Sequence, residues 1–233
     1  MRSQKLWGFT LIELLTVITI IFILAGLVLS VSRYVTNKGK MSRASAEIAG
    51  MSAACESYKA DNGVYPDDGT YNTSGTYVKG NTATLNAQTD GNPLSTASNT
   101  SGMTYPKASI VLYRALSGDT DCNGSVNSND QLFTLSGSAQ TGSGVNPTVY
   151  MSFKPTQLIT TGGTTAGSIT AIKDPWGYSY GYSTAYAGDI LISGTATHGY
   201  NPTFDLWSTT GATAASGTST SFSQYQQTWI TNW

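Results

Sequence analysis

Side chains with hard oxygen atoms recur at close spacing between residues 119 and 130. Asp119, Asp121, Asn123, Asn127 and Asp130 occupy positions 1, 3, 5, 9 and 12 of this stretch, and position 6 is a glycine. Ca²⁺ prefers six to eight hard oxygen ligands, and a glycine allows the sharp turn between ligand pairs. The spacing therefore predicts a structural calcium site.

The candidate calcium loop, residues 119–130, has the ligand register of an EF-hand loop. Ser125 would contribute its backbone carbonyl oxygen at position 7, and Val126 is the aliphatic residue at position 8. Position 12 is Asp130 instead of a glutamate, so its bidentate reach is shorter and we expect modest affinity. A turn rich in Asp, Asn and Gly after a helix would have a similar composition without binding a metal.

A second pattern with chemical potential is Gly177–Gly181, which matches the GxSxG nucleophile elbow around Ser179. That motif requires a strand, a strained turn and then a helix, with an acid and a histidine later in the chain. The sequence after Ser179 is turn-rich and strand-like, and His198 follows too closely for an acid-bearing strand to intervene. We therefore expect the chain not to be an enzyme.

The two cysteines, Cys55 and Cys122, have neither a metal-ligand spacing nor a CxxC motif. They would pair in an oxidising compartment or remain independent thiols, and the placement of Cys55 in a helix and Cys122 in a loop favours independent thiols. His198 is the only histidine, so it cannot complete a zinc site with these cysteines.

The charge balance argues against nucleic acid as a partner. The 233-residue chain has a net charge of −1, and only 11% of its residues are charged. Beyond residue 60 there are five basic and ten acidic residues, so this part carries −5. A body without a basic face lacks the cations that neutralise phosphates.

The N-terminal region predicts a membrane span. Leu11–Val31 is a 21-residue apolar run whose only charge is Glu13, and at about 1.5 Å per residue it covers about 30 Å. Arg2 and Lys5 precede it and should stay cytoplasmic. A secretory signal would be shorter and uncharged. Glu13 would cost roughly 2.5–3.5 kcal/mol at mid-membrane, so it should have a partner.

Helical periodicity continues beyond the span, over residues 33–61. One apolar stripe recurs at spacings of three and four, and it consists of Met41, Ala44, Ile48, Met51, Ala54, Cys55 and Tyr58. Asp61–Gly63 supplies a helix stop. We expect one helix of about 80 Å from Phe9 to about Asp61, with the body packed on its stripe.

Residues 62–233 predict a body rich in strands and loops. Residues 67–103 read as a polar loop with a short strand near Tyr77, and residues 106–116 as a helix. Strands are expected at Thr148–Phe153, Ile169–Lys173, Tyr178–Ser183, Asp189–Ser193 and Thr203–Trp207. The many Tyr and Trp residues would fill a small core or form a binding surface, and we favour the core.

Several segments carry a resemblance to a known family. Gly8–Glu13, with the sequence GFTLIE, resembles the processing site of type IV prepilins and type II secretion pseudopilins. Residues 56–66, 174–183 and 204–211 resemble segments of the major pseudopilin of type II secretion. The resemblance implies that a prepilin peptidase removes the leader, residues 1–8, after Gly8 and methylates Phe9. Residues 9–32 would then form the membrane and filament-core helix, and Glu13 would pair with the α-amine of a neighbouring subunit.

The resemblance also implies a fold, a location and partners. The fold would be α+β and pilin-like, with a long N-terminal helix packed against a small antiparallel sheet. The chain would be a single-pass protein of the bacterial inner membrane with a periplasmic body, assembled with copies of itself and other pseudopilins by an inner-membrane platform. A type IV pilus subunit or a surface-anchored adhesion module is the alternative.

Two positions depart from the family pattern. Many relatives have a proline where this chain has Ser30. Major pseudopilins hold a structural calcium in the loop after the strand at residues 204–207, whereas residues 208–227 contain no Asp or Glu here. We expect that family site to be absent and residues 119–130 to substitute for it.

Overall fold

The computed structural model gives a chain of two compact units, residues 1–42 and 43–233. It describes residues 8, 10–72, 74–88, 105–127, 130, 147–161, 168–211 and 226–233.

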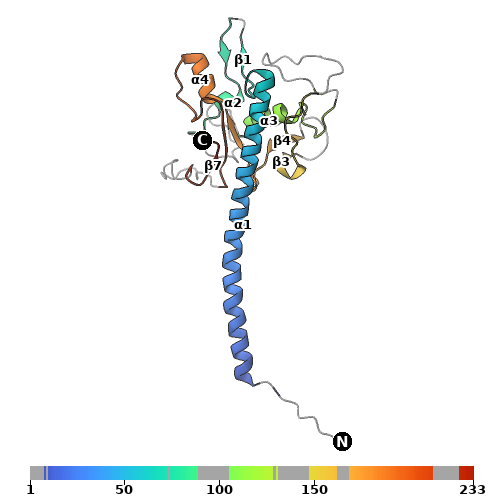
Figure 1. Cartoon of the computed structure of the whole chain (residues 1–233), viewed down its shortest axis with the longest axis vertical. Coiled ribbons are helices and arrows are strands. Elements are labelled where there is room, and N and C mark those ends of the chain that lie inside the picture. The colour runs from blue at the N-terminus through green and yellow to red at the C-terminus, as the bar shows by residue number, and fades with distance from the viewer. Residues whose placement is uncertain are drawn as a thin grey trace. The chain divides into compact units, whose positions relative to one another are not determined.

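A single helix, α1 (Leu11–Asn62), begins in the first unit and ends in the second (Figure 1). In the first unit its large apolar side chains from Leu11 to Val31 are 43% to 82% exposed. This part is long and apolar enough to cross a membrane. The helix bounds match the expected ones within two residues, because a long and strongly periodic segment leaves little ambiguity.

In the second unit, the last five turns of α1 contribute one face to the main core. The expected apolar stripe is buried from Ala44 onwards, with Ile48, Met51, Ala54, Cys55 and Tyr58 each at most 9% exposed. Met41, the first member of the expected stripe, lies in the first unit and is 37% exposed. From Ile48 onwards the stripe packs in one cluster with residues of one other helix, residues 105–117, and of the strands.

The second helix against this core is α3 (Tyr105–Ser117), in agreement with the expectation for residues 106–116. It packs on β4 (Ile169–Ile172) and β5 (Gly181–Ser183). The shorter helices are α2 (Asn81–Thr84), α4 (Ala185–Ser193) and the 3₁₀ turn Pro155–Gln157.

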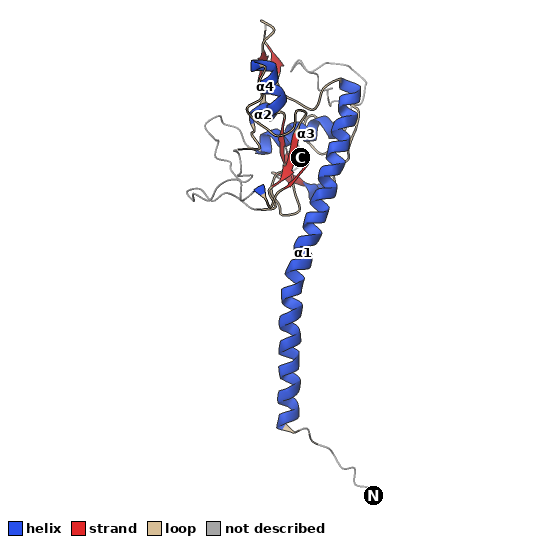
Figure 2. Cartoon of the chain, turned by 60° about the vertical axis from the view of Figure 1, so that its left-hand side comes forward, coloured by secondary structure: helices blue, strands red, loops and turns tan. Residues whose placement is uncertain are grey.

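The strands of the described residues form three small antiparallel sheets (Figure 2). The first pairs β1 (Thr70–Tyr71) with β2 (Tyr77–Val78), and the second pairs β3 (Leu158–Thr160) with β4. The third has the order β5, β6 (Asp205–Ser208), β7 (Ile230–Thr231). A long N-terminal helix with small antiparallel sheets confirms the α+β, pilin-like fold, although the body has several short sheets instead of one.

The expected strand at Asp189–Ser193 is wrong, because these residues end helix α4. Gly194 closes that helix in the left-handed conformation, and its N–H donates to the Ile190 carbonyl oxygen. A short apolar run is compatible with either a strand or a helix, so periodicity alone did not distinguish them.

The expected strand at Thr148–Phe153 is also wrong, because no strand lies among these residues. The N–H groups of Tyr150 and Met151 both donate to the Leu116 carbonyl oxygen, at 2.8 and 2.9 Å. The segment therefore provides hydrogen-bond donors for a carbonyl group at the C-terminal end of α3 instead of joining a sheet. The other three expected strands are present in shortened form as β4, β5 and β6.

Several of the described aromatic side chains of the body fill its core, as expected. Tyr180, Tyr182 and Trp207 are at most 1% exposed, and Trp229 stacks on Trp207 with ring centroids 6.2 Å apart. Gly181 makes room for this arrangement, because a Cβ atom there would lie 2.2 Å from the Trp207 ring.

Candidate calcium loop and processing site

The candidate calcium loop follows directly on α3. Gly118 adopts φ +75° and its N–H donates to the Arg114 carbonyl oxygen, which ends the helix and turns the chain into the loop. Within the loop Gly124 also has a positive φ, of 90°, as the turn between ligand pairs requires. Ser128 and Asn129 lie outside the described residues.

Three of the six sequence-predicted ligands come together. Asp119, Asp121 and Asp130 each offer a carboxylate oxygen, and these oxygens lie within 4.8 Å of one another. Asp119 and Asp130 are 1% and 3% exposed, whereas Asp121 is half-buried. Oxygen atoms at this spacing, presented by adjacent turns of one loop, suit a hard cation.

Backbone N–H groups hold the two buried carboxylates in place. Asp119 accepts from the Gly124 N–H at 2.7 Å and from the Tyr113 hydroxyl at 2.7 Å. Asp130 accepts from the N–H groups of Thr120 and Asn127, at 2.9 and 2.8 Å. The carboxylates are therefore positioned by the chain itself, and Tyr113 extends this support into α3.

Among the described residues, no cationic side chain forms an ion pair with the carboxylates of this cluster. In the described part of the chain, the ion pairs involve Glu47 and Asp189 and none reaches the loop. The pKa of Asp121 is raised, first by burial and then by its hydrogen bond to Asp119 and by the nearby charges of Asp119 and Asp130. A bound divalent cation would neutralise the repulsion among these carboxylates and favour their ionised form.

The remaining three predicted ligands are engaged elsewhere in the loop. The Asn123 side chain accepts from the Ser125 N–H and donates to Asp121, at 2.8 Å each. The Asn127 amide donates to the Ser125 carbonyl oxygen at 3.3 Å. The Asn123 amide oxygen and the Ser125 carbonyl oxygen therefore each accept one hydrogen bond that stabilises the turn, and each has a second lone pair.

Cys122 lies inside this loop but faces the core. Its thiol accepts from the Arg114 guanidinium at 3.1 Å, and its carbonyl oxygen accepts from Ser168 and Ile169, which ties the loop to β4. Cys55 and Cys122 are both buried and unpaired, and burial raises the pKa of each thiol.

At the processing site, Gly8 is exposed and Phe9 lies outside the described residues. Thr10 is the residue before α1, and its N–H and hydroxyl both donate to Glu13 Oε2 at 2.8 Å. The Glu13 N–H lies 3.4 Å from the Thr10 hydroxyl oxygen. This reciprocal arrangement is a capping box. The sequence signal that could have indicated this cap is T-x-x-E ahead of an apolar run.

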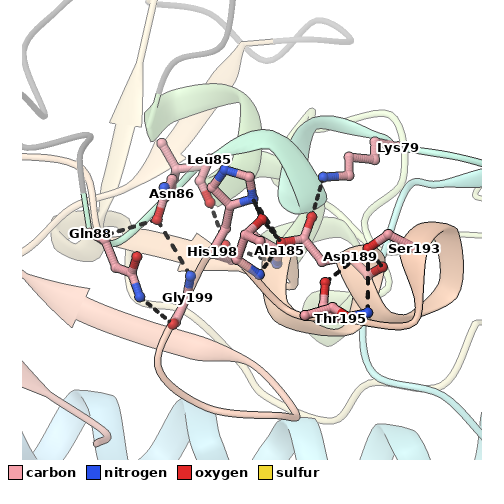
Figure 3. Close-up of polar contacts among 12 residues, drawn as sticks. Lys79, Leu85, Asn86, Gln88, Ala185, Asp189, Ser193, Thr195, His198 and Gly199 are labelled. Carbon is pink, nitrogen blue, oxygen red and sulfur yellow. Dashed lines mark hydrogen bonds and ion pairs between the residues drawn. The ribbon is translucent and has the colours of Figure 1, made fainter.

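Ser179 and His198 do not form a catalytic pair. Ser179 is 2% exposed, forms a bridge with Lys173, and is followed by strand β5. The ring of His198 contacts Asp189 at 2.7 Å, and Asp189 also pairs with Lys79 (Figure 3). His198 therefore belongs to a polar cluster that links the end of β2, α4 and the following loop.

Comparison with known proteins gives a partial match. The chain is 38% identical to the type II secretion system core protein G of Pseudomonas aeruginosa over 66 residues. This stretch is 28% of the present chain and 46% of that protein, so the chain spans less than half of the relative's length. No protein-family model matches the chain, and no solved structure matches it.

Proposed function

We propose that the chain is a pilin-like structural subunit that is assembled into a type II secretion pseudopilus. The observation that carries this proposal is α1, which begins three residues after the processing motif's Gly8 and exposes an apolar surface about as long as a bilayer is thick. The short similarity to a core protein of a type II secretion system supports it.

In this proposal a prepilin peptidase cleaves after Gly8 and methylates Phe9. The apolar part of α1 spans the inner membrane with the N-terminus in the cytoplasm, and the body lies in the periplasm. Copies of this chain and other pseudopilins then stack their helices into a filament through an inner-membrane platform. The work is mechanical, and the buried position of Ser179 and the contact of His198 with Asp189 support a non-enzymatic role.

Glu13 has two separable roles in this scheme. It caps α1 through Thr10, and its charge would neutralise the α-amine of a neighbouring subunit inside the apolar filament core. Glu13→Gln keeps an acceptor for the cap and removes the charge, whereas Glu13→Ala removes both.

The test is co-expression with a prepilin peptidase and the secretion platform, followed by scoring of cleavage after Gly8 and of filament yield. We expect cleavage in all three proteins and loss of filaments in both variants. Normal filaments from Glu13→Gln would refute the charge-pairing role, and failure to cleave the unmodified chain would refute the proposed function. Long filaments outside the cell would favour a type IV pilus instead.

We further propose that residues 119–130 hold a structural Ca²⁺ through the carboxylates of Asp119, Asp121 and Asp130, with Asn123, Ser125 and Asn127 as the remaining candidate ligands. The three converging carboxylates support this proposal. A bound cation would neutralise the cluster and fix the loop between α3 and β4. Calorimetric titration of the detergent-solubilised chain with CaCl₂ tests it, and the absence of any heat of binding would refute it.

A further inference from the structure

The eleven residues of α1 that directly follow its apolar run carry only positive charge. Residues 32–42, named here the basic segment, contain Arg33, Lys38 and Lys40 and no acid. The acidic residues nearest to it along the chain are Glu13 and Glu47. The segment is helical throughout, and the side chains of Arg33 and Lys38 are exposed.

An exposed aromatic residue lies among these cations. Tyr34 is 65% exposed, and the Lys38 ammonium lies 5.8 Å from the centroid of its ring. Tyrosine is enriched where a helix leaves the bilayer, and long basic side chains reach from such positions towards lipid headgroups. The composition of the segment is therefore that of a membrane interface.

The spacing along the helix places the three cations near the level of the lipid headgroups. If the apolar run ends at Val31, Arg33 lies about 3 Å beyond it, Lys38 about 10 Å and Lys40 about 14 Å. The headgroup layer adds about 5–8 Å to each side of the hydrocarbon. A Debye length of about 8 Å at physiological ionic strength extends the reach of the lipid charge further. All three cations lie within that range.

Orientation signalling does not account for these cations. Basic residues that set the orientation of a span are concentrated on its cytoplasmic side. Here two basic side chains, Arg2 and Lys5, precede the span and three follow it within ten residues. An excess on the body side needs another physical reason, and an anionic partner at the membrane surface supplies one.

We propose that the basic segment binds anionic phospholipid headgroups on the body side of the membrane. This inference rests on the proposed membrane span. The acidic body of a neighbouring copy is the competing partner, but the exposed Tyr34 and the depth of the cations favour lipid. Each cation near an anionic surface strengthens binding roughly fivefold, so the segment should select anionic over zwitterionic lipid.

The test uses the full chain reconstituted in phosphatidylcholine vesicles with a trace of spin-labelled phosphatidylglycerol or spin-labelled phosphatidylcholine. The fraction of each label immobilised by the protein gives its lipid selectivity. The test variant is Arg33→Gln/Lys38→Gln/Lys40→Gln. The control variant, Lys107→Gln/Lys154→Gln/Lys173→Gln, removes the same charge from the body.

We expect the unmodified chain and the control to prefer phosphatidylglycerol by about fivefold or more, and the preference to fall with added salt. The test variant should lose most of it. An equal preference in the test variant overturns the inference, and if that variant also fails to form filaments, the acidic body of a second copy is the partner.

Alkaline carbonate washing of the vesicles separates this inference from the proposed function. A chain that is washed off refutes the membrane span itself. A chain that stays in the vesicles but shows no preference for phosphatidylglycerol refutes only the lipid site.

Discussion

Replacement of Asp121 by asparagine should have opposite effects with and without calcium. In the metal-free protein the pKa of Asp121 is raised, first by burial and then by Asp119 and Asp130. Because the pKa of Asp121 is higher in the folded than in the unfolded chain, protonation of this carboxyl stabilises the fold. This contribution is fully present below the unfolded pKa of about 4, and it is lost as the pH rises through the folded-state pKa. At pH 7 in EGTA, Asp121→Asn should therefore be at least as stable as the unmodified chain.

Calcium should reverse that order. For a modest site with a dissociation constant of about 10 µM, 1 mM calcium adds about 2.7 kcal/mol of stability. In a domain of this size about 1 kcal/mol shifts the Tm by about 2–4 °C, so the expected rise is about 5–11 °C. Asp121→Asn replaces one of three charged ligands by a neutral amide and should lose most of this rise.

The assay is thermal unfolding of the detergent-solubilised chain, followed by near-ultraviolet circular dichroism in 1 mM CaCl₂ and in EGTA. Asp61→Asn is the matched control, because it removes one exposed carboxylate at the end of α1 and lies outside the loop. The control should show the full calcium effect. The reasoning fails if calcium does not raise the Tm of the unmodified chain, or if Asp121→Asn is the less stable protein in EGTA.

Three further outcomes follow from buried groups of the body. Cys55 and Cys122 should not react with a thiol reagent until the chain unfolds, because burial raises the pKa of both, and rapid labelling of the native chain would contradict this. Gly181→Ala should cost about 3 kcal/mol in urea unfolding, because its Cβ would lie 2.2 Å from the Trp207 ring; a loss well below 1 kcal/mol would count against the packing. Burial alone would raise the pKa of Asp189, but bonds from Lys79, Thr197 and His198 lower it. Asp189→Asn should therefore destabilise at pH 7, with a deficit that shrinks below pH of about 4, whereas a pH-independent deficit would refute the assignment.

The sequence predicted the two longest helices, α1 and α3, best, because their patterns were long. The 21 apolar residues from Leu11 and the stripe from Ala44 to Tyr58 sustain one period over many turns, so α1 followed from local information. Met41 shows the limit of that argument. It continues the period of the stripe but lies in the first unit and remains exposed. A period indicates which residues share a face, and the partner of that face is a tertiary property.

The short strands were predicted less well, because the partner of a short segment is also a tertiary property. Tyr150 and Met151 have strand-like neighbours, but the Leu116 carbonyl oxygen at the end of α3 accepts both of their N–H groups. The choice between a sheet and a helix end is decided by a residue more than thirty positions away. No pattern within residues 148–153 carries that information.

In the candidate calcium loop, the sequence likewise predicted some features and missed others. The spacing of acidic residues identified Asp119, Asp121 and Asp130, and these three carboxylates converge. It did not identify Tyr113, which lies in α3 and supports Asp119, because that contact depends on how the loop returns to the helix. It also predicts Asn123 and Asn127 as ligands, which stays a prediction; in this structure their side chains form hydrogen bonds within the turn.

The Glu13 side chain combines two roles, the capping of α1 and the proposed contact with a neighbouring subunit. Both hydrogen bonds from Thr10 go to Oε2, and within the described part of the chain Oε1 receives none. A carboxylate can therefore cap its own helix with one oxygen and pair with an α-amine through the other. Because Thr10 fixes the rotamer before any partner arrives, less side-chain entropy is lost when the proposed pair forms. The cap does not compete with the proposed assembly contact, and it positions the carboxylate for it.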